Sequence, residues 1–160
     1  MRALRDASSA RLISPLLLAA AMFTAAGGYV HLREWNRGYR HIPASITGSE
    51  VVRIGFPINA VVSAILAASL LFCALRASRL APLVAGTAFL FEATSLIVLI
   101  ATRTSNVLGW SETTWTLGAT ETRAVEIGAL VCLAGILAID THRRNAAVRL
   151  RRSPRPLLTN

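Results

Sequence analysis

Long apolar blocks alternate with short polar segments along the chain. The blocks cover about residues 12–32, 54–75, 80–102 and 123–140. A helix needs about 20 apolar residues to cross the hydrocarbon core of a bilayer, so each block is long enough, or nearly so, to span it. None alternates apolar and polar residues as the strands of a membrane β-barrel do. The pattern therefore predicts an all-α fold, an antiparallel bundle of four transmembrane helices.

The domain boundaries follow from the ends of these blocks. Residues 1–142 are predicted to form the transmembrane domain, and residues 143–160 a basic cytoplasmic tail that is partly helical near its start. Only residues 76–79 separate the second and third helices, which must form a tight hairpin. The fourth block is the shortest, and its helix has an alternative start near Gly118. The first block also fits a signal peptide, but it is longer than a usual signal core, which favours a retained helix.

The polar segments predicted to face outward carry ordered patterns of charged and aromatic residues. At helical spacing, residues 33–53 carry two faces. Arg33, Arg37 and Arg40 form one face, and Trp35, Tyr39 and Ile42 form the other. This spacing is typical of an amphipathic segment at the membrane interface. The second such segment carries Trp110 and Trp115. Because tryptophan and tyrosine gather at headgroup level, we expect Trp35, Tyr39, Trp110 and Trp115 to anchor the protein in lipid.

Composition and charge agree with this membrane location. Only 16% of the residues are charged, against roughly a quarter in soluble domains. The net charge is +9 and every basic residue is arginine, but the arginines lie at block ends, where they meet anionic lipid headgroups rather than nucleic acid. Eleven lie on the side of the termini and six on the other. The positive-inside rule then places both termini in the cytoplasm of a multi-pass inner-membrane protein, with Arg143 and Arg144 at the lipid surface.

Glu92 is the most informative residue, because it lies near the middle of the third apolar block. A carboxyl group at that depth is costly when it faces lipid. Its neighbours at steps of three and four are mostly small or polar, namely Ala81, Ala85, Ala88, Ser95, Leu99 and Thr102. Such a stripe usually faces other helices. We therefore expect Glu92 to point into the bundle, as a proton relay or ligand contact or, alternatively, as a structural link between helices.

Other polar residues occur at overlapping depths on the remaining helices. His31 ends the first block, Asn59 and Ser63 form an i,i+4 pair in the second, and Glu126 begins the fourth. Together with Ser95 they predict a polar pocket that opens outward, with Glu92 near its floor. Simpler roles also fit. Glu126 is spaced to pair locally with Arg123, Asn59 to link helices, and His31 to contact a headgroup, Glu126 or Trp35.

Recognised catalytic and cofactor motifs are absent from the sequence. There is no phosphate-binding loop, dinucleotide fingerprint, nucleophile elbow or HExxH pair. The three histidines do not have the spacing of a zinc site, and His142 lies on the opposite side from His31 and His41. The sequence therefore predicts no metal and no cofactor.

Three short stretches carry a resemblance to a known group. They are Gly28-Tyr29-Val30-His31-Leu32, then Tyr39-Arg40-His41-Ile42-Pro43, then an apolar helix from about Phe56. Over roughly residues 20–75 the chain resembles small four-helix membrane proteins of high-GC bacteria that have no known activity. The resemblance implies a fold and a location, and it implies nothing about mechanism.

These observations favour a protein that is not an enzyme, either an accessory subunit for a membrane partner or a bundle that binds a small ligand. One alternative is a small proton-coupled transporter built around Glu92, acting as a homo-oligomer. Another is a membrane enzyme or redox protein, which requires His31, Glu92 and Glu126 to converge around a cavity. The expected surroundings are a bilayer with anionic headgroups, with a protein partner or further copies of the chain.

Overall fold

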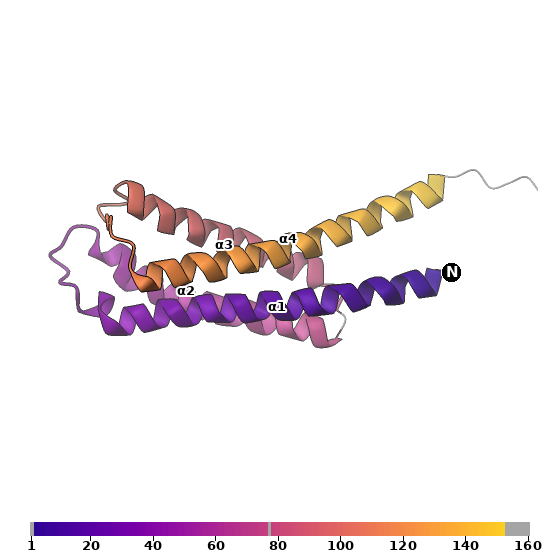
Figure 1. The fold of residues 1–160 in the computed structure, drawn as a ribbon, viewed down its shortest axis with the longest axis horizontal. Coiled ribbons are helices and arrows are strands. Elements are labelled where there is room, and N and C mark those ends of the chain that lie inside the picture. The colour runs from indigo at the N-terminus through magenta and orange to yellow at the C-terminus, as the bar shows by residue number, and fades with distance from the viewer. Residues whose placement is uncertain (1, 77, 153–160) are drawn as a thin grey trace, which may run out of the picture.

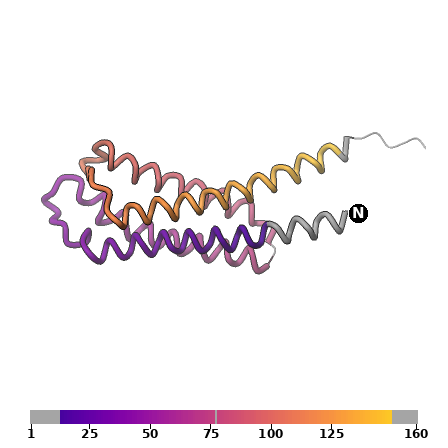
Figure 2. Tube along the Cα trace, viewed as in Figure 1, coloured from indigo at the N-terminus to yellow at the C-terminus, as the bar shows by residue number. Residues whose placement is uncertain are grey.

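The computed structural model describes residues 2–76 and 78–152, and side chains within 13–76 and 78–149 (Figures 1 and 2). Five elements follow one another in this part of the chain: α1 (Arg2–Arg37), the short 3-10 helix η1 (Tyr39–His41), α2 (Ser49–Arg76), α3 (Ala81–Thr104) and α4 (Leu117–Arg152). The described residues contain no β-strand, which confirms the all-α class. Residues 153–160 of the predicted tail lie outside the described part.

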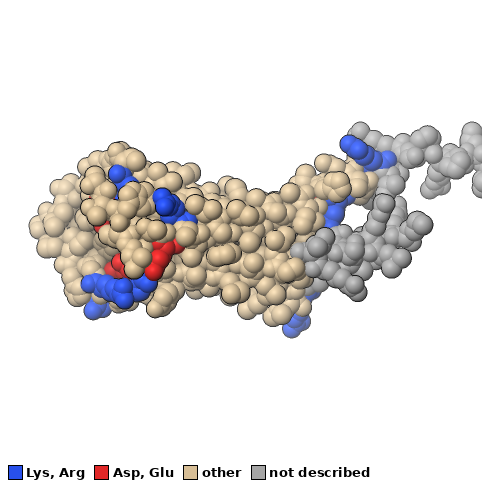
Figure 3. All heavy atoms as spheres, in the orientation of Figure 1, with Lys and Arg blue, Asp and Glu red and all other residues tan. Residues whose placement is uncertain are grey.

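Each of the four long helices is long and apolar enough to cross a membrane. Their outer surfaces carry many large apolar side chains, among them Met22, Ile65, Leu83 and Leu90, each more than half exposed. Charged side chains gather near the two ends of the molecule, and the middle of the visible face carries none (Figure 3). This distribution suits a lipid environment and indicates a multi-pass membrane protein.

Two helices extend beyond the predicted limits. Residues 33–37 continue α1 rather than forming a separate segment, and the Gly38 amide closes the last turn on the Glu34 carbonyl at 3.1 Å. α4 begins at Leu117, close to the alternative start near Gly118 and six residues before the predicted start at residue 123. Thr116 caps it, its hydroxyl oxygen accepting a hydrogen bond of 3.2 Å from the Ala119 amide. The predicted tail is helical through Arg152.

In Figure 1, α1 and α3 run toward one end of the molecule, and α2 and α4 run back. We call that end, which holds residues 38–48 and 105–116, the loop end; the opposite end, where α2 turns into α3, is the terminal end. α1 packs along both α2 and α4, and α3 packs mainly on α4, whereas α2 and α3 touch far less. The least packed space in the bundle therefore lies between α2 and α3.

Small side chains bring the helices close together. Ala81, Ala85, Ala88, Glu92 and Thr102 are the buried stripe of α3, which confirms that Glu92 points into the bundle. At Gly28 on α1, an added Cβ would lie 2.7 Å from the Ser63 Cβ of α2, so no larger residue fits without movement. The core itself is apolar and lies toward the terminal end, centred on Leu17, Leu70, Leu133 and Ile136.

The loop end is a folded cap. Gly48 and Gly109 both have positive φ, and an added Cβ on Gly48 would lie 2.2 Å from the Gly109 carbonyl carbon. Only glycine allows both this conformation and this approach, so the two loops lie against each other. Beside the cap, Arg33 of α1 bonds to Glu34 and to Glu121 of α4, which joins the ends of these two helices.

Candidate ligand-binding site

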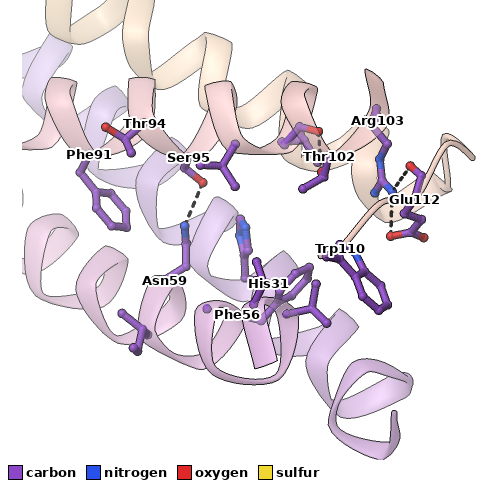
Figure 4. Close-up of a pocket in the computed structure, with 16 residues that line it drawn as sticks. His31, Phe56, Asn59, Phe91, Thr94, Ser95, Thr102, Arg103, Trp110 and Glu112 are labelled. Atoms are coloured by element: carbon purple, nitrogen blue, oxygen red, sulfur yellow. Dashed lines mark hydrogen bonds and ion pairs between the residues drawn. The ribbon is translucent and has the colours of Figure 1, made fainter. Parts of the chain in front are cut away.

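A cavity of about 230 Å³ lies between α2 and α3, toward the loop end (Figure 4). Its walls are mainly apolar, and Phe56, Phe91, Val98 and Leu99 are among the side chains that line it. Gly55 also lines it, and a Cβ atom added there would meet nothing within 4 Å. The cavity follows from the sparse contact between the two helices, and it can hold a small apolar group.

A chain of hydrogen bonds runs from the cavity wall into the bundle. The Asn59 amide donates to the Ser95 hydroxyl at 2.9 Å, the contact drawn in Figure 4. Ser95 in turn donates to Glu126 Oε1 at 2.5 Å, and Ser63 donates to Asn59 Oδ1 at 3.2 Å. α2, α3 and α4 are therefore linked by polar contacts at the level where α2 and α3 separate.

Glu126 and Glu92 lie behind this chain, in the bundle interior. Both are almost fully buried, and their carboxyl groups lie near each other. The Thr24 hydroxyl of α1 lies near the Glu92 carboxyl. Yet Thr24 Oγ1, Glu92 Oε1 and Glu126 Oε2 are buried without a hydrogen bond to any other described group. Three such oxygens in one region are unusual, because buried polar atoms are nearly always satisfied.

His31 lines the cavity between the polar chain and the loop end (Figure 4). Its Nδ1 lies 3.0 Å from the carbonyl oxygen of Gly27 in its own helix, and its ring packs on Phe56 at 5.1 Å between centroids. No hydrogen bond joins His31 to Glu92 or Glu126 within the described residues. Direct hydrogen bonds between His31 and the two glutamates therefore do not bring these three side chains together in the described part of the chain.

A buried ion pair closes the cavity at the loop end. Arg103 and Glu112 are 2.7 Å apart, and the Arg103 side chain is only 4% exposed. The same carboxyl group accepts a hydrogen bond of 2.7 Å from the Tyr39 hydroxyl. Arg103 also donates to the Glu112 carbonyl at 2.8 Å, but its Nε is buried and makes no hydrogen bond within the described chain. The cavity lining thus includes one guanidinium group among mainly apolar side chains.

The predicted pocket is only partly the observed one. His31, Asn59 and Ser95 line the cavity, whereas Glu92 and Glu126 are not among its lining residues, so a pocket floor at Glu92 stays a prediction. Glu126 bonds to Ser95 and not to Arg123, whose guanidinium stacks 4.8 Å from the Trp115 ring. Sequence reasoning missed Arg103 and Glu112. Their separation by a loop gave no periodic signal, although an arginine at the end of an apolar block was a hint.

All four proposed anchors make contacts within the protein, Trp115 through the guanidinium groups of Arg103 and Arg123. The Trp35 ring nitrogen donates to the Arg53 carbonyl at 2.9 Å, and Tyr39 packs against Phe56 and Trp110. Trp115 is 43% exposed. The cap thus uses these rings to hold the loop end together, and anchoring in lipid stays a prediction.

Arg143 and Arg144 lie at the terminal end, far along α4 from this cavity, where Arg144 pairs with Asp140 at 2.7 Å. Within the described residues, no group of three or more histidine, cysteine, aspartate or glutamate side chains is placed to hold a metal ion. No known protein family matches the chain, and neither does any curated protein or solved structure. The function must therefore be argued from the site itself.

Proposed function

We propose that this chain is an antiparallel bundle of four transmembrane helices that binds a small, mainly apolar ligand between α2 and α3. The observation that carries the proposal is the cavity together with Arg103, whose buried Nε has no partner among the described groups. An unsatisfied buried donor costs about 1–3 kcal/mol. A ligand oxygen that reached this nitrogen from the cavity would remove that cost.

The cavity also indicates the ligand's chemical class. Asn59 and Ser95 already bond to each other, and Glu112 neutralises the charge of Arg103, so a second anion has no free cation to pair with. The unpartnered Nε of Arg103 therefore favours a neutral hydrogen-bond acceptor on the ligand, such as a carbonyl or ether oxygen. At about 230 Å³ the space lies below the roughly 300–1,000 Å³ of drug-sized sites, which favours a short chain over a large ring system.

Photolabelling tests this proposal directly. The purified full chain in lipid would be exposed to a diazirine-bearing medium-chain methyl ketone and to the matched alkane without the carbonyl. We expect the ketone to label peptides of α2 and α3 around Phe56 and Phe91, and the alkane to label them more weakly. Equal labelling by both probes, spread over exposed apolar residues of the other two helices such as Met22 and Val131, would contradict the proposal.

The same proposal places both termini in the cytoplasm, because the arginine count favours the terminal end as the inner side. Ser111 and Asn145 are exposed near opposite ends of the bundle. A membrane-impermeant thiol reagent added to intact cells should label Ser111→Cys and spare Asn145→Cys, with the native cysteines replaced. The reverse pattern would invert the topology.

A second candidate is a proton-coupled carrier that uses Glu92, favoured by the three unpartnered oxygens of Thr24, Glu92 and Glu126. Protons moving through a membrane need ionisable groups, such as the carboxyl groups of Glu92 and Glu126, and access to water. Infrared titration of the carboxyl bands, compared with Glu92→Gln, tests this. A Glu92-dependent band that titrates in the physiological pH range and exchanges rapidly in D₂O supports the carrier. A band that does neither leaves Glu92 as a structural link.

A further inference from the structure

A second cavity, of about 310 Å³, lies at the terminal end of the bundle. Its lining comes from α1, the end of α2, the turn between α2 and α3, the start of α3 and the part of α4 around Asp140. It shares no lining residue with the cavity between α2 and α3. Any ligand it holds is therefore separate from the ligand of the proposed function.

The rim of this second cavity is basic. Arg79, Arg143 and Arg144 line it, and the acidic residue among its lining side chains is Asp140. Because Asp140 pairs with Arg144 at 2.7 Å, the lining keeps an excess of positive charge at Arg79 and Arg143. In addition, Arg143 Nη2 is buried and makes no hydrogen bond to another described group. A guanidinium group with an unpartnered N–H can bind an oxyanion, because an oxyanion accepts strong charge-assisted hydrogen bonds.

The floor of the cavity is apolar. Leu17, Cys73 and Ile136 line it, and each is at most 2% exposed, as members of the bundle core. A soluble anion makes no use of such a floor, whereas a lipid places its phosphate at the rim and the first part of its chains below. Basic pockets between transmembrane helices at a membrane surface commonly hold lipid headgroups in this way.

We propose that this second cavity is a specific binding site for the phosphate group of an anionic phospholipid. Arg143 donates to the phosphate oxygens from inside the cavity, Arg79 contributes charge from the turn, and the apolar floor receives the glycerol end of the lipid chains. The site is distinct from diffuse attraction between the arginines of α4 and an anionic surface, because it depends on one partly buried guanidinium.

Native mass spectrometry of the full chain tests the site, with phosphatidylglycerol or phosphatidylcholine titrated into neutral detergent. Arg143→Gln removes the buried donor, and Arg149→Gln is the matched control, since Arg149 is exposed on the same helix and does not line the cavity. A charge-assisted hydrogen bond contributes enough for its loss to weaken binding about tenfold or more. We expect wild type and Arg149→Gln to bind one phosphatidylglycerol with the same affinity. In Arg143→Gln the affinity should fall about tenfold or more.

Further arms separate the remaining outcomes. Arg79→Gln, in the exposed turn, should weaken binding without disturbing the core, so it replaces Arg143→Gln if that variant fails to fold. Equal loss in Arg149→Gln would mean diffuse charge attraction and would overturn the proposal. So would inorganic phosphate that displaces phosphatidylglycerol completely at millimolar concentration, because the site would then serve a soluble anion. Equal binding of phosphatidylcholine would also overturn it.

Discussion

The Ser95 hydroxyl donates a hydrogen bond of 2.5 Å to Glu126 Oε1, and through it the wall of the cavity is joined to the interior of the bundle. Ser95 belongs to α3 and Glu126 to α4, so the contact also fixes the rotation of one helix against the other. Because Asn59 of α2 donates to the same hydroxyl, three helices depend on one serine.

Replacing this serine should therefore be costly. Ser95→Ala leaves the buried Oε1 of Glu126 without a donor, and we expect a loss of about 1–3 kcal/mol of stability. Thr87→Ala on the same helix is the control, because the exposed Thr87 hydroxyl bonds only to the Leu83 carbonyl one turn earlier, at 3.1 Å. Its effect should stay within about 0.5 kcal/mol. Unfolding in mixed detergent micelles measures both variants, and equal effects would mean that the three-helix contact contributes nothing.

The close approach of α1 and α2 gives a second prediction. Gly28→Ala places a methyl group 2.7 Å from the Ser63 Cβ and should destabilise the bundle by about 1–3 kcal/mol. Gly27→Ala meets Val125 at an ordinary 3.6 Å and should be neutral or slightly stabilising, since alanine favours helix. The double variant Gly28→Ala with Ser63→Gly should recover part of the loss in the same unfolding assay. A tolerated Gly28→Ala would show that the helices are farther apart than described.

The buried pair at the loop end gives a third. Glu112→Gln keeps the shape of the side chain but leaves the charge of Arg103, 4% exposed, without its counter-charge. Removing one partner of a fully buried pair costs roughly 3–5 kcal/mol, and because Glu112 is 25% exposed we expect less, about 2 kcal/mol. Arg37→Gln, by contrast, breaks a contact of 3.9 Å to Glu34 at a site that is 68% exposed, and should change stability by at most about 0.5 kcal/mol. Fluorescence of Trp110, which lies beside this pair, reports the unfolding of the cap.

The sequence predicted what depends on local pattern. Four apolar blocks gave four long helices, because hydropathy sums over neighbouring residues. The spacing of small residues around Glu92 gave its inward orientation, because a helix that buries a carboxyl group must turn that face to other helices. The apolar pattern did not decide where α4 begins. The helix begins at Leu117 because the Thr116 hydroxyl caps its first turn.

What the sequence did not predict depends on how whole helices pair. The cavity exists because α2 and α3 touch little, and no residue in either helix shows this by itself. Glu126 is spaced equally well for Arg123 and for a partner on another helix, and only the rotation of α4 toward Ser95 decides between them. Arg103 and Glu112 meet through the fold of the loop between α3 and α4, which leaves no periodic trace in the sequence.

The most direct test of the proposed function is to fill the cavity without disturbing the bundle. Gly55→Leu adds bulk at a position that lines the cavity, and Gly86→Leu adds the same side chain on α3 at a position that lines neither cavity. An added Cβ would meet nothing within 4 Å at either glycine. We predict that ketone photolabelling of the peptides around Phe56 and Phe91 falls at least about tenfold in Gly55→Leu and is unchanged in Gly86→Leu, with unfolding of both variants as in wild type. Undiminished labelling in Gly55→Leu would contradict a ligand site between α2 and α3.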